Sequence, residues 1–303
     1  MKRYQVGSDL TEKEIFHLVE TGERGFSDQL LRLSDQLLEQ EDLHFLGLTG
    51  PTCSGKTTTA EMLTDAFENA GKQIRVISID DFYYDKDYLQ AMAEKKGLAS
   101  LDYDSEDTID VALLEESVRS LREQKRTVLP KFNFTTGLRE EGETICPCAK
   151  DIFLFEGIQV LYPRVDGILQ GDGYRSIHIA PQSAVETGGE VFDPNEIRLM
   201  RRLVRDYRFR SSSPQFTFSL WQSVRENEER MIFPNVHRCD YSIDSTMPYE
   251  IGILKPFLVD ILSPISKDES GYSTAQTLLS ELRGVQTLSA ELIPEKSLYK
   301  EFI

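Results

Sequence analysis

The stretch GPTCSGKT, Gly50 to Thr57, decides the fold, because two glycines separated by four residues are followed by a lysine and a hydroxyl residue. Small residues let successive backbone N–H groups surround a polyphosphate, Lys56 can reach the terminal phosphates, and the Thr57 hydroxyl can ligate Mg2+. An apolar run of strand type, Leu43 to Leu48, precedes the loop, and a helical pattern, Thr58 to Ala70, follows it. This order of strand, loop and helix predicts a phosphate-binding loop at a helix N-terminus.

Composition places the chain among soluble globular proteins, with 303 residues of which 40% are hydrophobic and 28% charged. That length fits one large α/β domain or two smaller ones. No apolar run is long enough to span a bilayer, and Met1-Lys2-Arg3 leads into polar residues rather than a signal segment, which favours a cytoplasmic protein. A net charge of −17 disfavours nucleic-acid binding through a broad basic surface. An anionic ligand must therefore meet a local cluster of cations.

The four cysteines are interpreted as free thiols. Cys146 and Cys148 form a close pair, but no second Cys or His pair stands at the spacing of a structural zinc site. Cys53 lies within the phosphate loop, so its oxidation would affect phosphate binding.

Two carboxylates follow strand-like runs downstream of the loop. The run Gln73 to Ile79 ends in Asp80, about thirty residues after Gly50, which is the length of one β-α-β unit. A right-handed crossover makes the two strands parallel, so Asp80 is expected at the same sheet edge as the phosphate loop. There it can act as a general base and metal-shell ligand, and the alternative is a turn or cap aspartate. The buried-type run Ile152 to Glu156 predicts a central strand whose last residue lies near Mg2+.

The segment between these strands leaves alternatives open. Carboxylates from Asp102 to Asp110 can cap the helix expected up to Arg126, or one of them can bind a sugar diol. In the stretch Leu129 to Arg139, core packing of Phe132 and Phe134 is as plausible as ligand stacking.

Arginines recur at helical spacing later in the chain. Arg198, Arg201, Arg202 and Arg205 share one face of an expected helix, while leucines occupy another. One interpretation is that this stripe neutralises a carboxylate surface. The nearby flexible stretch Ser211 to Pro214 favours a second, a mobile lid that brings guanidinium groups onto phosphates.

Together these segments resemble the uridine kinase branch of the phosphoribulokinase/uridine kinase family of P-loop kinases. The matching segments are the phosphate loop, Ser78 to Tyr83, Tyr103 to Asp110, Pro130 to Arg139, Phe155 to Gly157 and Arg198 to Asp206. The later part, from Trp221 to Ile303, resembles a longer bacterial form that is often found behind a TGS domain, here without that domain.

The resemblance implies an α/β fold, a P-loop NTPase three-layer sandwich with a mainly parallel sheet and a helical lid. It divides the chain into an N-terminal helical extension at 1–41, a kinase domain at 42–265 with its lid at about 198–234, and a C-terminal helical extension at 266–303 that packs on the kinase domain.

The resemblance also implies residue roles. Asp80 is expected as the catalytic base, assisted by Lys56 and Arg201, and Mg2+ is expected at Thr57, Asp80 and Glu156. Asp104, Phe132 and Arg139 are expected to bind the acceptor. ATP is expected at Gly50, Cys53, Ser54, Gly55, Lys56, Thr57, Thr58, Arg198 and Arg202.

One departure concerns the acceptor. Uridine-cytidine kinases have a tyrosine and a histidine that help to read the pyrimidine, where this chain has Phe132 and Gly137. Loss of polar contacts relaxes or redirects recognition. The expected reaction is transfer of the ATP γ-phosphate to a nucleoside 5′-hydroxyl, and the alternatives are another sugar alcohol or phosphosugar as acceptor, or a non-catalytic nucleotide-binding regulatory module. Partners are expected to be a small molecule and neither nucleic acid nor membrane, with homo-oligomerisation left open.

Overall fold

A five-stranded parallel sheet forms the centre of the fold. The computed structural model describes residues 2–95, 97 and 105–303. The strands run in the order β10-β7-β2-β6-β3, and each neighbouring pair is parallel. They are β2 (Phe45–Thr49), β3 (Gln73–Ser78), β6 (Asp151–Glu156), β7 (Tyr174–Ala180) and β10 (Tyr241–Asp244).

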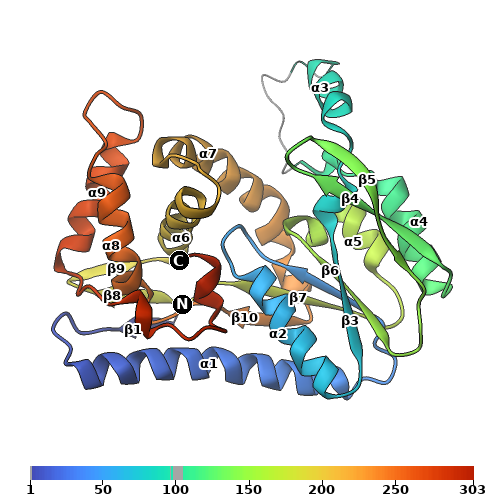
Figure 1. Cartoon of the computed structure of the whole chain (residues 1–303), viewed down its shortest axis with the longest axis horizontal. Coiled ribbons are helices and arrows are strands. Elements are labelled where there is room, and N and C mark those ends of the chain that lie inside the picture. The colour runs from blue at the N-terminus through green and yellow to red at the C-terminus, as the bar shows by residue number, and fades with distance from the viewer. Residues whose placement is uncertain (1, 96, 98–104) are drawn as a thin grey trace.

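Helices cover both faces of this sheet, because its strands are apolar on both sides. In β6, Ile152 and Leu154 pack into one core cluster, while Phe153 and Phe155 pack into another. The first cluster includes side chains of α1 (Glu12–Leu38), α2 (Lys56–Asn69), α6 (Pro194–Phe209) and α8 (Glu250–Leu262), and the second includes those of α4 (Val111–Arg122) and α5 (Pro163–Leu169). The expected three-layer α/β sandwich is confirmed (Figure 1).

The phosphate loop connects β2 to α2. Helix α2 begins at Lys56, immediately after Gly55, whose φ of 94° lies in the left-handed region that glycine adopts without strain. The expected helix began two residues later, at Thr58. Strand β3 ends at Ser78, and a 3-10 turn, Ile79–Phe82, carries Asp80 at the sheet edge.

The N-terminal segment differs from the helical extension that the sequence predicts. It begins with a strand, β1 (Arg3–Gln5), which pairs with β8 (Ala184–Thr187), and β8 pairs in turn with β9 (Glu190–Phe192). The long helix α1 follows, and its first turn has a capping box between Thr11 and Glu14. Helix α1 is not peripheral, because its apolar stripe is buried in the first core cluster.

An antiparallel hairpin lies beyond β3, on the other side of the sheet from α9 (Tyr272–Glu281) (Figure 1). It consists of β4 (Thr127–Asn133) and β5 (Leu138–Ile145), and it packs near α3 (Lys86–Lys95) and α4. None of the described helices is long and apolar enough to cross a membrane.

Helix α6 is part of the core layer. Its residues Ile197, Met200 and Leu203 are fully buried against the same cluster as the sheet. Helix α7 (Pro214–Asn227) follows a turn and continues as a π-helical turn, Glu228–Ile232. The helical cover over the phosphate loop therefore combines an arginine-bearing core helix with α7.

Candidate active site

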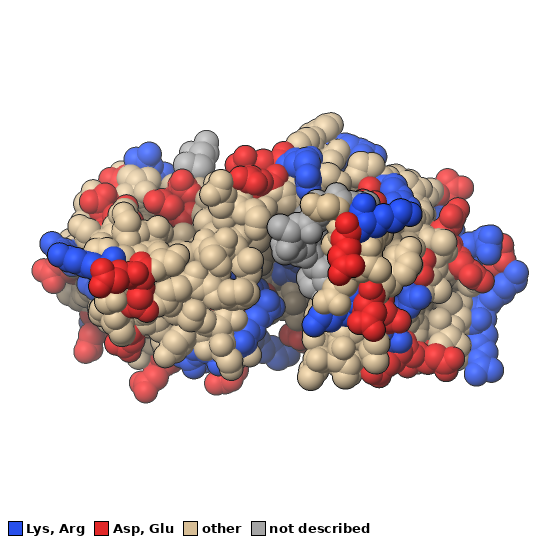
Figure 2. Space-filling view, turned by 90° about the horizontal axis from the view of Figure 1, so that it is seen from above, with Lys and Arg blue, Asp and Glu red and all other residues tan. Residues whose placement is uncertain are grey.

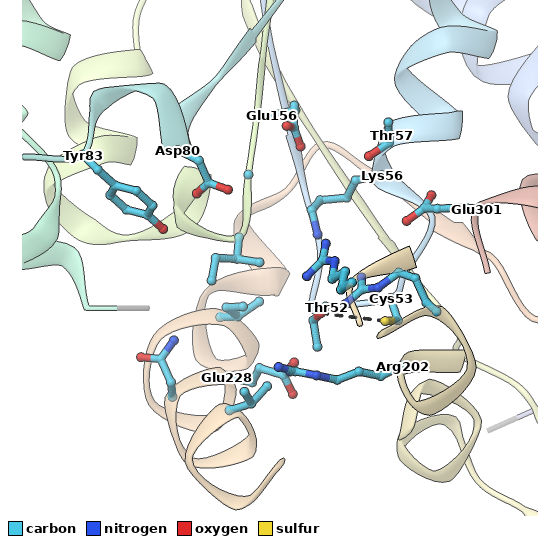
Figure 3. Close-up of a pocket in the computed structure, with 17 residues that line it drawn as sticks. Thr52, Cys53, Lys56, Thr57, Asp80, Tyr83, Glu156, Arg202, Glu228 and Glu301 are labelled. Atoms are coloured by element: carbon cyan, nitrogen blue, oxygen red, sulfur yellow. Dashed lines mark hydrogen bonds between the residues drawn. The ribbon is translucent and has the colours of Figure 1, made fainter. Parts of the chain in front are cut away.

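A pocket of about 280 Å³ opens at the carboxyl ends of β2, β3 and β6. Side chains from opposite sides point into it, with Asp80 and Tyr83 across from Arg202 and Glu301 (Figure 3). Its described lining contains four cationic side chains and four carboxylates, which are Lys56, Arg202, Arg205, Arg210, Asp80, Glu156, Glu228 and Glu301. The pocket lies where ligands bind in open α/β sheets.

The phosphate loop has the backbone of an anion cradle. Cys53 has a φ of 58° and Gly55 one of 94°, and such positive values curve successive peptides around a concavity. A Cβ on Gly50 would lie 2.0 Å from the carbonyl oxygen of Ile179, so the loop passes the neighbouring strand too closely for a side chain. The hydroxyl of Ser54 is buried and has no hydrogen-bond partner among the described groups. These features fit a bound polyphosphate.

Lys56 lies across this cradle. Its Nζ donates to the carbonyl oxygens of Gly50, at 2.9 Å, and Pro51, at 3.2 Å. Both are weak neutral acceptors compared with a phosphate oxygen, so a polyphosphate would be the better partner for the ammonium group.

Two of the arginines expected at the ligand are buried ion pairs instead. Arg198 donates to both carboxylate oxygens of Glu228, at 2.6 and 2.7 Å, and the Nε of Arg201 donates to Glu250 at 2.8 Å. The side chains of Arg201 and Glu250 are 0% exposed. Neither arginine lines the described pocket. The prediction that Arg198 and Arg201 face the phosphates is therefore corrected.

Both buried arginines donate hydrogen bonds to backbone carbonyl groups of the phosphate loop. Arg198 donates to the carbonyl oxygen of Thr52 and Arg201 to that of Cys53, each at 3.3 Å. These hydrogen bonds fix the orientation of the two carbonyl groups. The two arginines therefore stabilise the conformation of the phosphate loop.

Three other arginines, Arg202, Arg205 and Arg210, face the pocket and share one carboxylate. The shortest distances from Arg202, Arg205 and Arg210 to Asp206 are 3.2, 2.7 and 3.7 Å. Burial lowers the pKa of Arg210, and the neighbouring Arg205 lowers it further. Three cations beside one carboxylate leave an excess of positive charge, which is what a phosphate group requires. Arg202 is predicted to bind the nucleotide, and Arg205 shares the arginine face that is predicted to reach phosphates, but the sequence predicts no individual role for Arg205 or Arg210.

Asp80 is held at the pocket by a side-chain amide. Gln159 Nε2 donates to its Oδ1 at 2.8 Å and to the hydroxyl of Tyr83 at 2.8 Å. Asp81 instead accepts from the backbone N–H of Phe132 and from Lys131, each at 3.1 Å. Of the two adjacent aspartates, Asp80 alone lines the pocket in the described structure. Gln159 was not singled out in the sequence, because a glutamine one turn beyond a strand has no distinctive pattern.

Glu156 lies at the end of β6, where Ser78 Oγ donates to its carboxylate at 3.0 Å. Burial raises the pKa of Glu156, Lys56 lowers it, and Asp80 raises it. The described residues contain no group of three metal-binding side chains. Oxygen donors from Thr57, Asp80 and Glu156 fit Mg2+, which keeps several waters and binds through one or two carboxylates together with phosphates.

The residues expected to bind the acceptor are arranged differently from the prediction. Phe132 is 3% exposed and packs edge-on against Tyr83 and Phe134, at centroid distances of 5.5 and 5.1 Å, so it belongs to the core and not to the pocket wall. Arg139 donates to Asp110 at 2.9 Å and does not line the described pocket. Asp104 lies outside the described residues.

Gly137 has a structural role in the turn of the hairpin. Its φ is 73°, and a Cβ there would lie 2.8 Å from the Cβ of Lys86. The backbone N–H of Lys86 donates to its carbonyl oxygen at 2.8 Å. A histidine at this position would be strained and would displace Lys86, so the missing base-reading side chain is a consequence of the local packing.

One part of the pocket lining has uncharged side chains, those of Tyr83, Ile158, Val224, Asn227 and Ile232. Asn227 is 4% exposed, and its Nδ2 donates to the hydroxyl of Tyr162 at 2.7 Å. This wall is partly apolar. None of these five lining residues carries a charge.

The outer surface gives no comparable cationic site on the face shown in Figure 2. Lysine and arginine side chains are mixed there with aspartate and glutamate over both halves of the molecule. That face therefore shows no broad patch of a single charge.

Comparison with known proteins gives a consistent set of relatives. The model of the Phosphoribulokinase / Uridine kinase family matches residues 45–251. Uridine-cytidine kinase B of Dictyostelium discoideum is 25% identical over 246 residues, which are 81% of this chain and 91% of that protein. A uridine kinase of Lactobacillus johnsonii is 32% identical over 209 residues, which are 69% of this chain and 89% of that protein. Among solved structures, phosphoribulokinase from Rhodobacter spheroides has a TM-score of 0.45 with 13% identity, covering 69% of this chain and 75% of that one.

Proposed function

The chain belongs to the phosphoribulokinase/uridine kinase family, and on this premise we propose that it is an ATP- and Mg2+-dependent kinase of a small-molecule hydroxyl. The proposed acceptor group is the 5′-hydroxyl of a nucleoside, the class named by the uridine kinase relatives. One observation carries the proposal: the carboxylate of Asp80 faces the same pocket as Lys56 and three arginines.

Positioning and charge account for most of the catalysis of phosphoryl transfer. Lys56 and the arginines Arg202, Arg205 and Arg210 lie on the described lining of one pocket, so they can neutralise the charge that spreads over the transferring group. Arg205 is buried and fixed by two bonds to Asp206, at 3.0 and 2.7 Å, so little reorganisation is needed when phosphate enters. These residues replace Arg198 and Arg201 in the proposed site.

Asp80 is the proposed general base. The amide of Gln159 fixes one of its carboxylate oxygens and leaves the other available to accept the proton of the attacking hydroxyl. The acceptor would enter beside Tyr83, which lies on the same side of the pocket as Asp80 (Figure 3), and Ile158 also lines the pocket.

Mg2+ would be held by Thr57, Asp80 and Glu156, and it would supply further neutralisation of the phosphate charge. Burial raises the pKa of Glu156 and Lys56 offsets this only in part, so the ionised carboxylate carries a free-energy cost. A cation bound nearby would remove that cost.

The acceptor itself is the least constrained part of the proposal. Phe132 and Gly137 offer no polar side-chain contact for a pyrimidine. A kinase of another sugar alcohol or phosphosugar is therefore the second candidate, and the apolar wall of Ile158, Val224 and Ile232 favours the uncharged sugar alcohol of these two.

We also propose that the kinase domain, residues 42–265, is continuous with its flanking segments. Strand β1 pairs with β8, and Leu298, Tyr299 and Phe302 lie in the core cluster that contains α2 and α6. Removal of either flank would expose core residues.

The experiment is ADP production with a panel of nucleosides, sugars and phosphosugars, with ATP or GTP as donor, by the purified chain and by Asp80→Asn. The matched control is Asp81→Asn, the adjacent carboxylate that faces the hairpin. We expect Asp80→Asn to lower kcat by roughly 10²- to 10⁴-fold with nucleotide affinity nearly unchanged, and Asp81→Asn to keep most of the activity.

Two results would overturn parts of this proposal. Tight nucleotide binding without turnover of any acceptor would favour the regulatory module. Retention of most of the rate by Asp80→Asn would show that Asp80 is not the base.

A further inference from the structure

The segment Ser297–Phe302 packs directly against the phosphate loop and α2. A Cβ on Gly55 would lie 2.2 Å from Cδ1 of Leu298, which shows how closely the segment approaches the loop. In Figure 1 this part of the chain lies between α2 and α6. Residues far from the loop in sequence thus form part of its surroundings.

Aromatic side chains anchor this segment. The rings of Tyr299 and Phe302 lie on the guanidinium of Arg201, at 5.5 and 5.0 Å from their centroids, and the hydroxyl of Tyr299 donates to Glu250 at 2.9 Å. Both rings are fully buried. Glu301 lies between these two anchored residues, so its backbone is fixed beside the pocket.

The carboxylate of Glu301 stands between two cavities. It lines the pocket described above, where it points toward Thr57 and Lys56 (Figure 3). It also lines a second hollow, of about 530 Å³, between α2 and residues 295–301. Thr57 is the other residue that lines both. A ligand whose phosphates rest on the loop can therefore extend past Glu301 into the second hollow.

The carboxylate of Glu301 opposes a polyphosphate electrically. Glu301 forms no ion pair with any described residue. Its Oε2 accepts from the hydroxyl of Thr58 at 3.3 Å. A ligand that offered neutral hydroxyl donors next to its phosphates would match this group, and the two oxygens of a carboxylate suit two adjacent hydroxyls.

We propose that Glu301 binds the ribose hydroxyls of the donor nucleotide, whose base occupies the hollow between α2 and residues 295–301. The ribose of a nucleoside triphosphate lies between the base and the phosphates, as Glu301 lies between the hollow and the loop. This inference rests on the proposed function for the presence of a nucleotide. It assigns the donor end of the site to a segment beyond the residues matched by the family, 45–251.

The test is direct measurement of dissociation constants by calorimetry, with the whole chain, for ATP, 2′-deoxyATP, 3′-deoxyATP and inorganic tripolyphosphate. The variant is Glu301→Gln, whose amide oxygen can still accept from Thr58. The matched control is Glu291→Gln, an exposed glutamate outside both cavities. We expect the dissociation constant of wild type for ATP to be lower than that for at least one deoxy analogue by about 10-fold or more, which is the effect of losing a hydrogen bond to a charged group. Glu301→Gln should lose that preference, and removal of its negative charge should tighten tripolyphosphate binding more than ATP binding, because only ATP also loses its hydroxyl contacts.

Other outcomes contradict the proposal. If Glu301→Gln tightens the binding of ATP, both deoxy analogues and tripolyphosphate by the same factor, then Glu301 acts only by opposing phosphate charge. Equal affinity of wild type for ATP and both deoxy analogues would exclude ribose recognition while leaving the kinase proposal intact. If wild type binds tripolyphosphate but no nucleotide, both the inference and the proposed function fail. Thermal unfolding of each variant checks that a loss of affinity does not reflect a loss of folding.

Discussion

Replacement of Arg201 tests whether this arginine supports the fold or the chemistry. Its guanidinium and the carboxylate of Glu250 are both 0% exposed, and the ion pair is 2.8 Å long. Arg201→Met leaves Glu250 as a buried carboxylate without its cation, and Glu250→Gln leaves Arg201 as a buried cation without its carboxylate. Breaking one side of a buried pair costs about 3–5 kcal/mol. At roughly 2 °C of Tm per kcal/mol, each single variant should unfold about 6–10 °C lower.

The double variant Arg201→Met/Glu250→Gln measures the interaction energy between the two side chains, apart from the contacts that each makes with its other neighbours. It leaves no unpaired charge, so it should lose less stability than the sum of the single variants, with a coupling of about 2–3 kcal/mol. Urea unfolding without nucleotide measures all four proteins, and kcat is measured well below the lowest Tm. We expect Arg201→Met to lose mainly stability and, through the carbonyl of Cys53, some nucleotide affinity. A catalytic role for Arg201, and not a structural one, would follow if Arg201→Met unfolds like wild type but has kcat lowered more than about 100-fold.

Three further predictions concern the pocket. Gly55→Ala should lower the free energy of unfolding by at least about 1–3 kcal/mol and abolish nucleotide binding, because the φ of Gly55 is 94° and the space beside it is filled. Gly25→Ala, inside α1 where a Cβ would have nothing within 4 Å, should raise the free energy of unfolding by about 0.5–1 kcal/mol. Urea unfolding compares the two variants. Arg205→Gln should weaken ATP binding by roughly 10-fold or more, and Arg208→Gln, exposed and outside the pocket, should leave the dissociation constant unchanged. Burial raises the pKa of Glu156, so its ionised form lowers the free energy of unfolding; this cost is absent below about pH 4 and grows as the pH rises. Without Mg2+ or nucleotide, the Tm of Glu156→Gln should therefore match that of wild type near pH 4 and exceed it at pH 7. Equal Tm values of the two proteins at both pH values would contradict this role of burial.

Local pattern and chain order were sufficient to predict the centre of the fold. The phosphate loop is recognisable because glycine, lysine and threonine act through their immediate neighbours. The positions of Asp80 and Glu156 at one sheet edge follow from the right-handed crossover of parallel strands. Both side chains lie on the described pocket, although their catalytic roles remain predictions.

The roles of the arginines could not be predicted in the same way. Helical spacing shows which arginines share a face, but it does not show what packs against that face. Glu228 and Glu250, which neutralise Arg198 and Arg201, come from elements at least 30 residues away in sequence. A long-range partner of this kind leaves no periodic trace.

Short strands were missed for another reason. Strand β1 has three residues, too few for an alternating pattern, and it forms only because β8 offers a free edge.

The ambiguity of Phe132 is similar, because a lone aromatic residue has the same sequence environment in a core as in a binding site. Its contacts with Tyr83 and Phe134 show that it is part of the core.

The packing of Leu298 on Gly55 has a consequence for synthesis on the ribosome. The chain is made from its N-terminus, so the phosphate loop emerges long before the segment that covers it. A nascent chain that ends before Leu298 already contains every strand of the central sheet, but Arg201 lacks the rings of Tyr299 and Phe302, and Glu301 is absent. Nucleotide should therefore not stabilise the nascent chain fully until this segment has left the exit tunnel, so the loop matures only after residues 298–302 have emerged.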